Sequence, residues 1–286
     1  MRNRLAKLTG NAVWYVWQYH FKWSKNPIDH KKVVFILFAG RAGSKFLIDH
    51  LHRLPHTRFE YELFKPAALA GRHRLLRMMR YAHGRYRSQV YAARSLREIL
   101  RRISGRTVGI KITFDQVENS GMTVRELCDE FPEAKYLILY RRRLAEQFLS
   151  LQLAEVTGQW GLYAGETNFA EREATRLYLS RQEFEQYAER IKRQYRQAVR
   201  ALSQSGRKFL VLAYEDLRED PEGHMKRWIA PFLESEVERP YEAVVQRQRN
   251  RSVREVVKNF EEVEDLFSLE KYEFLLEASG VEADDC

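Results

Sequence analysis

Residues 31–51 (KKVVFILFAGRAGSKFLIDHL) constrain the fold of this chain more than any other stretch. The run from Val33 to Phe38 is apolar, β-branched and aromatic, which is typical of a strand buried on both faces of a parallel sheet. After Gly43 the apolar spacing becomes helical, with Phe46 and His50 on one face. The stretch therefore predicts a buried strand, a loop of small residues and a helix.

The loop between this strand and this helix, residues 39–45, has the chemistry of an anion site, and we call it the anion loop. Gly40 and Gly43 allow a tight turn and leave backbone N–H groups accessible. Ser44 lies at the expected start of the helix, whose free N–H groups and dipole attract anions. Arg41 and Lys45 add two positive charges. The loop therefore predicts a phosphate or sulfate site, although an ordinary tight turn uses the same glycines. It is not a Walker A motif, which requires GxxxxGK[ST].

A second basic turn follows another predicted strand, residues 135–140 (KYLILY). Arg141, Arg142 and Arg143 come directly after it, before a predicted helix that contains Ser150. An arginine offers a bidentate fork to a phosphate. Since parallel strands end at the same edge of a sheet, this turn is expected near the loop described above.

These two stretches resemble the corresponding motifs of the PAPS-dependent sulfotransferases, in their bacterial and carbohydrate-type branch (PAPS is 3′-phosphoadenosine 5′-phosphosulfate). AGRAGSKFL is similar to the 5′-phosphosulfate loop of that family. Lys45 departs from the family pattern, because it stands where a hydroxyl residue is usual, but it could supply a charge. The matching residues are Arg41, Ala42, Gly43, Ser44 and Phe46.

The same resemblance implies residues around the 3′-phosphate. The family motif there is an Arg with a Ser eight residues later, and Arg142 and Ser150 have that spacing. Arg141 is the alternative if the register differs by one. Bacterial relatives also carry a basic stretch near the 3′-phosphate, which implies Arg251 here, with Arg249 in reserve.

The resemblance also suggests residues on the acceptor side. A Glu shortly before a Pro is a candidate base in carbohydrate-type members, which points to Glu62 first and Glu60 second. We expect their strand, residues 57–61, to end beside the anion loop. The segment GIKITFDQ implies acceptor or sulfate contacts by Lys111 and Asp115, although Lys111 could equally be a strand-edge charge.

Further strands are predicted at residues 106–113 and 207–213, alternating with helices. This alternation predicts an α/β fold with a central parallel sheet of about five strands and right-handed crossovers. The resemblance implies a P-loop-like three-layer sandwich. We expect a single sulfotransferase-like domain over residues 31–286, preceded by a basic amphipathic helix over residues 1–30. That helix either docks on the domain or contacts a membrane surface.

Composition narrows the class of partner and the compartment. Lys and Arg number 49 against 39 Asp and Glu, a formal net charge of +10, which favours anionic partners or serves solubility. Only two cysteines are present, so no disulfide framework is expected, as in a reducing cytoplasm. No apolar run approaches the ~18 residues of a membrane span, and the histidines show no metal-ligand spacing.

We therefore expect a cytoplasmic enzyme, which associates with a membrane if its N-terminal helix contacts the membrane surface. The resemblance implies that it transfers the sulfuryl group of PAPS to a hydroxyl of a carbohydrate or glycolipid by in-line displacement, releasing PAP without a metal. Two alternatives stay open. One is a P-loop-like ATP-dependent kinase, which would lack the Walker Lys-Ser/Thr pair. The other is a non-enzymatic basic protein that binds nucleic acid, a partner that the main interpretation does not expect.

Overall fold

The computed structural model describes residues 31–60, 96–97, 100, 105–158, 175–238, 251–268, 274 and 276. The predicted N-terminal helix, Glu62 and Arg249 lie outside the described residues.

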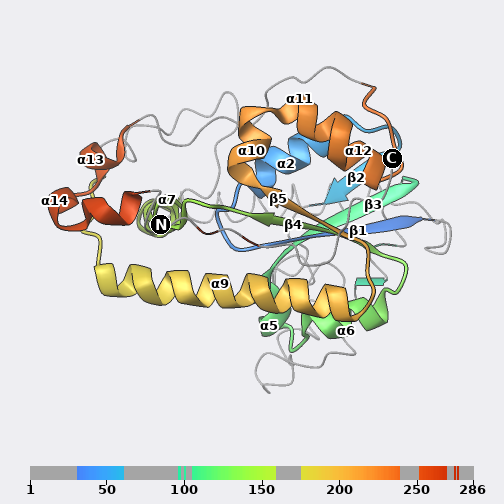
Figure 1. Ribbon diagram of the computed structural model, residues 1–286, viewed down its shortest axis with the longest axis horizontal. Helices are drawn as coiled ribbons and strands as arrows, with labels where there is room; N and C mark the ends of the chain where they lie inside the picture. The colour runs from blue at the N-terminus through green and yellow to red at the C-terminus, as the bar shows by residue number, and fades with distance from the viewer. Residues whose placement is uncertain are drawn as a thin grey trace, which may run out of the picture.

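The centre of the molecule is a five-stranded parallel sheet with the strand order β2-β3-β1-β4-β5 (Figure 1). This sheet confirms the predicted α/β class, and the predicted strand ends agree with the observed ones to within two residues. The strands are β1 (Lys32–Phe38), β2 (Thr57–Glu60), β3 (Thr107–Thr113), β4 (Lys135–Tyr140) and β5 (Phe209–Ala213).

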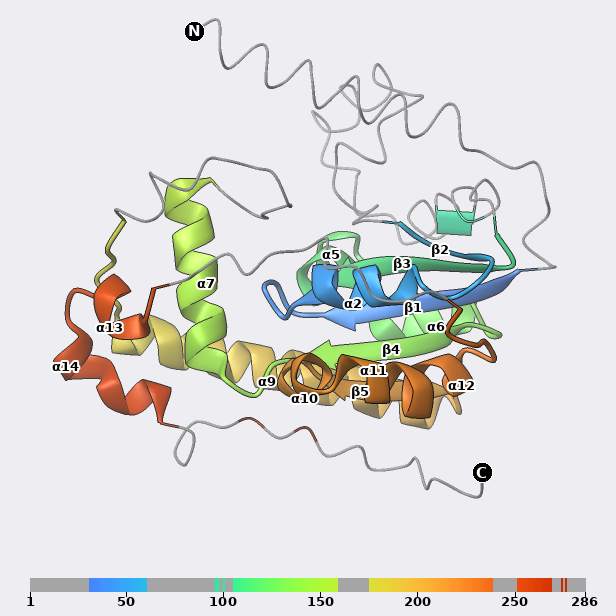
Figure 2. The ribbon, with the colours of Figure 1, turned by 90° about the horizontal axis from the view of Figure 1, so that it is seen from above.

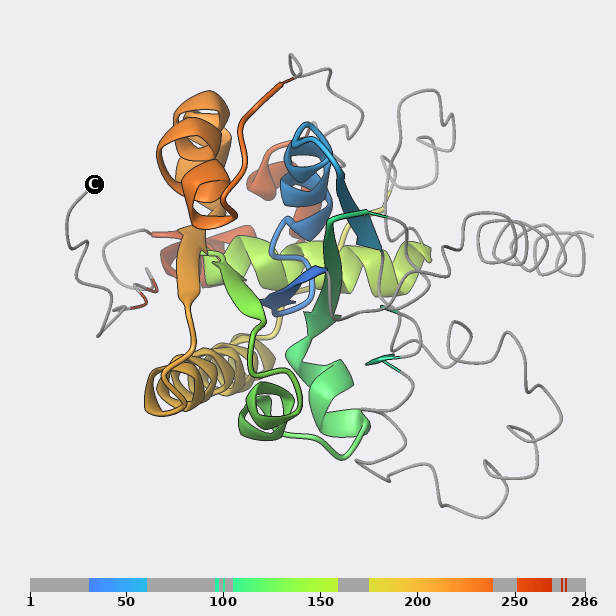
Figure 3. The same ribbon diagram turned by 90° about the vertical axis from the view of Figure 1, so that its right-hand side faces the viewer.

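Helices cover both faces of the sheet, because side chains of β1 alternate between two buried layers. Val34, Ile36 and Phe38 face a layer that contains α2 and the helices after β5, whereas Val33, Phe35 and Leu37 face α5, α6 and α9. Figure 3 shows these two groups of helices on opposite faces of the sheet. The first layer consists of α2 (Ser44–Leu51), α10 (Tyr214–Glu219), α11 (Pro221–His224), a π-helical turn (Met225–Ile229) and α12 (Ala230–Phe232). The second consists of α5 (Phe114–Asn119), α6 (Val124–Glu130) and α9 (Arg181–Gln204).

Local capping signals start several of these helices. Thr123 and Glu126 form a capping box at the start of α6, as their spacing predicts. Ser180 accepts a hydrogen bond from the backbone N–H of Glu183 at the start of α9. Asp220 caps α11, whose first residue is a proline. The residues that form each cap lie within a few positions of one another in the chain, so each cap can be recognised from the sequence alone.

The position of β2 differs from the sequence prediction. We expected this strand beside the strand that carries the anion loop, but β3 lies between β2 and β1. Glu60 therefore ends an edge strand, paired with Ile110 of β3. Periodicity predicts that a strand exists, whereas strand order depends on which buried faces meet. Lys111, on β3, is consequently the nearer of the predicted acceptor-side residues to β1.

The sheet changes its direction of winding between β1 and β4. The chain leaves β1 through α2 on one face, and it leaves β4 through α7 (Leu144–Thr157) and then α9 on the other. α7 crosses beyond the carboxyl ends of the strands at a steep angle (Figure 2). Ligands of open α/β sheets bind at such a switch point, so a binding site is expected at the carboxyl ends of β1 and β4.

Short helices complete the far side of α7, namely α13 (Val253–Val256), α14 (Phe260–Val263) and a 3-10 turn (Glu264–Phe267). Leu177 forms a parallel β-bridge with Val257. The Asn259 side chain accepts from the backbone N–H of Leu179 and donates to its carbonyl oxygen. These contacts fix α13 and α14 to the segment that enters α9.

Candidate active site

The anion loop after β1 has an unusual backbone. Arg41 and Gly43 both have positive φ, at 68° and 91°, in the left-handed region that most side chains avoid. A Cβ added to Gly43 would overlap Cδ2 of Tyr214, the first residue of α10. Gly43 is therefore required both by its backbone conformation and by the aromatic ring against it. The result is a tight loop that joins the end of β1 to the first turn of α2.

Side chains of the loop and of β3 converge at the start of α2. Ser44 is the first residue of α2 and is buried, with its Oγ 3.5 Å from Nζ of Lys111. Lys111 is itself only 2% exposed, although it carries an ammonium group. Lys45 lies in the same first turn, and Phe46 packs edge-on against Tyr214. Positive charge and free helix N–H groups therefore share one place, as an anion site requires.

Helix α7 holds the loop from its other side. Nε and Nη2 of Arg41 donate hydrogen bonds to Ser150 Oγ, at 3.1 and 3.0 Å. One turn earlier on the same helix, the side-chain amide of Gln147 donates to the Gly40 carbonyl oxygen at 2.7 Å. Gln147 is fully buried, and no sequence pattern distinguished it as a site residue. These contacts hold Arg41 in its left-handed conformation.

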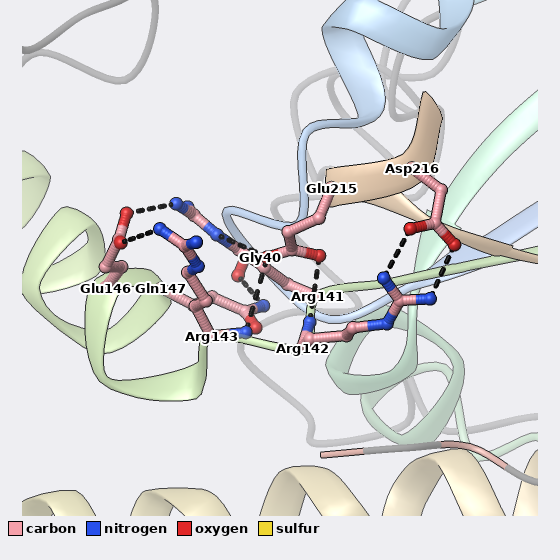
Figure 4. Close-up of polar contacts among 8 residues, drawn as sticks. All are labelled: Gly40, Arg141, Arg142, Arg143, Glu146, Gln147, Glu215 and Asp216. Carbon is pink, nitrogen blue, oxygen red and sulfur yellow. Dashed lines mark hydrogen bonds and ion pairs between the residues drawn. The ribbon is translucent and has the colours of Figure 1, made fainter. Parts of the chain in front are cut away.

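Arg141, Arg142 and Arg143 form the turn after β4, which we call the arginine turn. Carboxylates from two other elements hold it in place (Figure 4). Glu215 accepts hydrogen bonds from the backbone N–H groups of Arg142 and Arg143, at 3.0 and 3.3 Å. Asp216 takes the Arg142 guanidinium in a bidentate pair. Glu146 accepts from Nη2 of Arg141 at 2.9 Å and from Nη1 of Arg143 at 3.2 Å. The guanidinium groups of Arg141 and Arg143 therefore converge on Glu146, whereas that of Arg142 points away from them toward Asp216.

This arrangement distinguishes the two arginines that the sequence offers for a phosphate. The Arg141 guanidinium lies 5.2 Å from the ring centroid of Tyr214, the same ring that packs against Gly43. Arg142 is turned instead toward Asp216 on α10. Ser150, expected to act with Arg142, is in contact with Arg41. The contacts thus favour Arg141 as the arginine that shares its surroundings with the anion loop.

A buried tyrosine joins the two turns beneath their backbones. The Tyr195 hydroxyl on α9 accepts from the backbone N–H of Ala39 at 3.0 Å and donates to the Leu139 carbonyl oxygen at 2.7 Å. Burial raises the pKa of this phenol, so it stays protonated. Tyr187 lies two turns earlier on α9, and its hydroxyl is buried without a hydrogen-bond partner in the part of the chain that the structure describes.

A buried histidine lies on the helix that follows the anion loop. His50 is fully buried, with the Phe46 ring 4.6 Å from its own. Burial lowers its pKa from 6.5 to about 4, and the charge of Arg53 acts in the same direction, against a smaller opposing effect of Glu222. Arg53 forms an ion pair with Glu222 of α11 at 2.6 Å. His50 is therefore neutral in the folded protein at physiological pH.

The remaining predicted residues lie in the following places. Asp115, at the start of α5, accepts hydrogen bonds from Arg190 and Gln194 of α9. Arg251 donates to backbone carbonyl oxygens of Thr175 and Glu255, at the base of α13. Glu60 is the last residue of β2. The roles of these three residues stay predictions.

Several features of this edge were not visible in the sequence. Tyr214 and Glu215 belong to the segment after β5, in which no site residue was predicted from the sequence. Gln147 and Tyr195 follow the helical period of α7 and α9 and otherwise resemble any core residue. The only signal in the sequence for these residues was their position within or just after a predicted strand or helix.

Among the described residues, no group of three or more His, Cys, Asp or Glu is placed to hold a metal ion, and no helix is long and apolar enough to span a bilayer.

Comparison with known proteins gives a direct result for the family. The model of the sulfotransferase family matches residues 33–239, which include β1 to β5 and both turns at the strand ends. A crystal structure of a sulfotransferase from Alicyclobacillus acidocaldarius aligns with a TM-score of 0.46 and 19% identity, covering 83% of this chain and 91% of that one. No curated protein matches the chain significantly. Because the family model covers well over half of the sequence, the chain belongs to the sulfotransferase family.

Proposed function

We propose that this protein transfers a sulfuryl group from PAPS to a hydroxyl group of an acceptor, and that the acceptor is a carbohydrate or glycolipid. The observation that carries the donor proposal is the pairing of two cationic turns at one switch point. The anion loop presents Arg41 and the start of α2, and the arginine turn presents Arg141, with Tyr214 between them. A nucleotide with phosphate groups at both its 5′ and 3′ positions has the charge distribution that suits two such turns.

The residues present fit such a donor. A Cβ at Gly43 would collide with the Tyr214 ring, so only glycine lets this ring pack directly against the loop that would hold the 5′ end. Ala42, Gly43, Ser44 and Lys45 would surround the 5′ end, with Phe46 beside them. Arg141, with Arg142 as the residue first suggested by spacing, would meet the 3′-phosphate together with Ser150. Arg251 remains a further candidate for the same phosphate.

When bound, PAPS supplies an activated sulfuryl group whose leaving group is the 5′-phosphate of PAP. The acceptor oxygen forms a new bond to sulfur while the bond between sulfur and that phosphate oxygen breaks. Arg41, Lys45 and the loop N–H groups stabilise the negative charge that develops on the leaving oxygen. Lys111 lies near enough to Ser44 to contribute to the same charge stabilisation.

The acceptor hydroxyl needs a base, because a neutral alcohol is a weak nucleophile. We assign this role to Glu62 first and to Glu60 second, since both follow the edge strand β2 or end it. A positioned carboxylate typically contributes about 10²–10⁴-fold to the rate. We expect Glu62→Gln to abolish turnover while PAP affinity stays unchanged. If Glu60→Gln is the inactive variant instead, the two roles are exchanged.

Nucleotide binding tests the donor. Ligands that bind only the native state raise its stability by mass action, so PAP is expected to raise the melting temperature more than AMP does. If ATP with Mg²⁺ stabilises the protein more than PAP, a kinase replaces this proposal. Incubation of glycans and lipids with labelled PAPS then identifies the acceptor, and a salt-dependent shift assay with nucleic acid tests the remaining alternative.

Location in the cell is a separate part of the proposal. We propose a cytoplasmic enzyme that contacts a membrane surface through the basic residues 1–30 when its acceptor is a glycolipid. Flotation of the full-length chain with anionic and neutral vesicles tests this contact. If the protein floats only with anionic vesicles, the result supports the contact. If the amount of protein in the floating fraction is the same without vesicles, the contact is rejected.

A further inference from the structure

The carboxylate of Glu215 has three neighbours that all belong to the arginine turn. Two are the backbone N–H groups of Arg142 and Arg143, at 3.0 and 3.3 Å. The third is Nε of Arg141, 3.6 Å away. The Glu215 side chain is only 20% exposed. A half-buried carboxylate with two hydrogen-bond donors and one charged neighbour from a single turn fixes the position of that turn relative to α10.

The same carboxylate takes part in orienting one particular guanidinium. Arg141 lies over the ring of Tyr214, with its Nε toward Glu215 and its Nη2 on Glu146 at 2.9 Å. Its Nη1 has no hydrogen-bond or ion-pair partner within the described part of the chain. Tyr214, Glu215 and Glu146 therefore hold the group and leave a donor for a ligand. Figure 4 shows Arg141 between the two carboxylates.

The neighbouring carboxylate has a different consequence. Asp216 binds Arg142 through both of its oxygens and keeps that guanidinium on the α10 side of the turn. Adjacent positive charges in an unpaired turn would repel each other and sample many rotamers. The carboxylates reduce this freedom, because Asp216 holds Arg142 while Glu146 and Glu215 hold Arg141.

We propose that Glu215 is a positioning residue that holds Arg141 ready for the 3′-phosphate of the nucleotide. The inference rests on the proposed function, because it needs a nucleotide that carries this phosphate. Glu215 does not touch the ligand and acts through Arg141 and the turn backbone. A purely structural cap would affect every nucleotide alike, whereas a positioning residue for Arg141 affects only those with a 3′-phosphate.

The test compares PAP with AMP, which lacks the 3′-phosphate, by titration calorimetry. Glu215→Gln keeps one acceptor oxygen and replaces the other with a donor, so it cannot hold both backbone N–H groups and Arg141. We expect its dissociation constant for PAP to rise about tenfold or more, because a charge-assisted contact is lost. Its affinity for AMP should match that of the wild type.

Glu219→Gln is the matched control, because it removes the same charge from an exposed position on the same helix. It should bind PAP as the wild type does. In an Arg141→Gln background, Glu215→Gln should cause little further loss, since the residue through which it acts is already gone. Glu215→Asp keeps the charge but withdraws it from Arg141, and it gives the same selective loss if the Gln variant fails to fold.

Equal losses for PAP and AMP, no loss for either, or full additivity with Arg141→Gln would each overturn the inference. A wild-type protein that binds neither nucleotide would instead refute the proposed function. The two failures are therefore distinguished in one series of titrations.

Discussion

The two turns at the strand ends are held in place by different means. The anion loop depends on backbone conformation, with positive φ at Arg41 and Gly43 and an aromatic ring packed against a missing side chain. The arginine turn depends on carboxylates from α7 and α10 that divide its guanidinium groups among them. The first is a local device with a recognisable motif. The second is a network assembled from segments more than seventy residues apart in the chain.

The comparison predicts that small changes of shape damage the first turn most. Gly43→Ala places a Cβ at φ 91° and against the ring of Tyr214. We expect a loss of roughly 1–3 kcal/mol in the free energy of unfolding and no measurable PAP binding. Gly40→Ala is the control, since its added Cβ meets nothing within 4 Å. Urea unfolding should place it within about 1 kcal/mol of the wild type. Similar losses for both variants would contradict the special role of Gly43.

In the second turn, charge matters more than shape. Arg141→Ala should weaken PAP binding by roughly 1.5–3 kcal/mol, the usual contribution of a hydrogen bond to a charged group, and leave AMP binding unchanged. Arg142→Ala should mainly release Asp216, at a cost of about 0–1 kcal/mol in stability for a partly exposed pair. Calorimetry with both nucleotides decides between them. A selective loss of PAP affinity in Arg142→Ala would return the 3′-phosphate to the residue that spacing first suggested.

One hydroxyl connects the two turns, so its removal should affect both. Tyr195→Phe leaves the buried N–H of Ala39 and the carbonyl of Leu139 without their side-chain partner, which costs about 1–3 kcal/mol. Tyr187→Phe is the matched control on the same helix, because its hydroxyl has no partner among the described residues. We expect it to be neutral or slightly stabilising. Equal unfolding midpoints in urea for the two variants would show that the Tyr195 bridge contributes nothing.

The last expected effect is a dependence on pH that arises on the anion-loop side. His50 has a pKa of about 4 in the folded protein and 6.5 as its ordinary value, because burial opposes its charged form. Between these values the unfolded chain binds more protons, so stability falls as the pH is lowered from about 6.5 toward 4. The slope due to this residue is at most about 1.4 kcal/mol per pH unit.

Urea unfolding at pH 7 and pH 5 measures this dependence. His50→Phe should lose the part of the slope that His50 contributes, whereas His52→Phe, a change to the exposed residue that caps the same helix, should keep it. An unchanged slope in the His50 variant would assign the acid sensitivity to other groups.

Much of this architecture follows from patterns within short stretches. The apolar runs of β1 and β4 indicate strands buried on both faces, and Thr123 with Glu126 marks the start of α6 within four residues. Strand order did not follow, since the insertion of β3 between β2 and β1 depends on which faces pack together. The base is the least determined part, because Glu62 lies outside the described residues and Glu60 is one strand farther from β1 than expected.

The anion loop is what the sequence by itself determined about this protein. Its glycines, its serine and its flanking charges are adjacent in the chain, and the physics of a helix N-terminus needs nothing more. Which arginine faces the loop was decided only by the tertiary structure. Three consecutive arginines are equivalent in sequence, and they become different when Glu146 of α7 and Glu215 and Asp216 of α10 pair with different donors of the turn. Charge pairing acts through space and carries no trace in local spacing, so the fold had to form before the roles could be told apart.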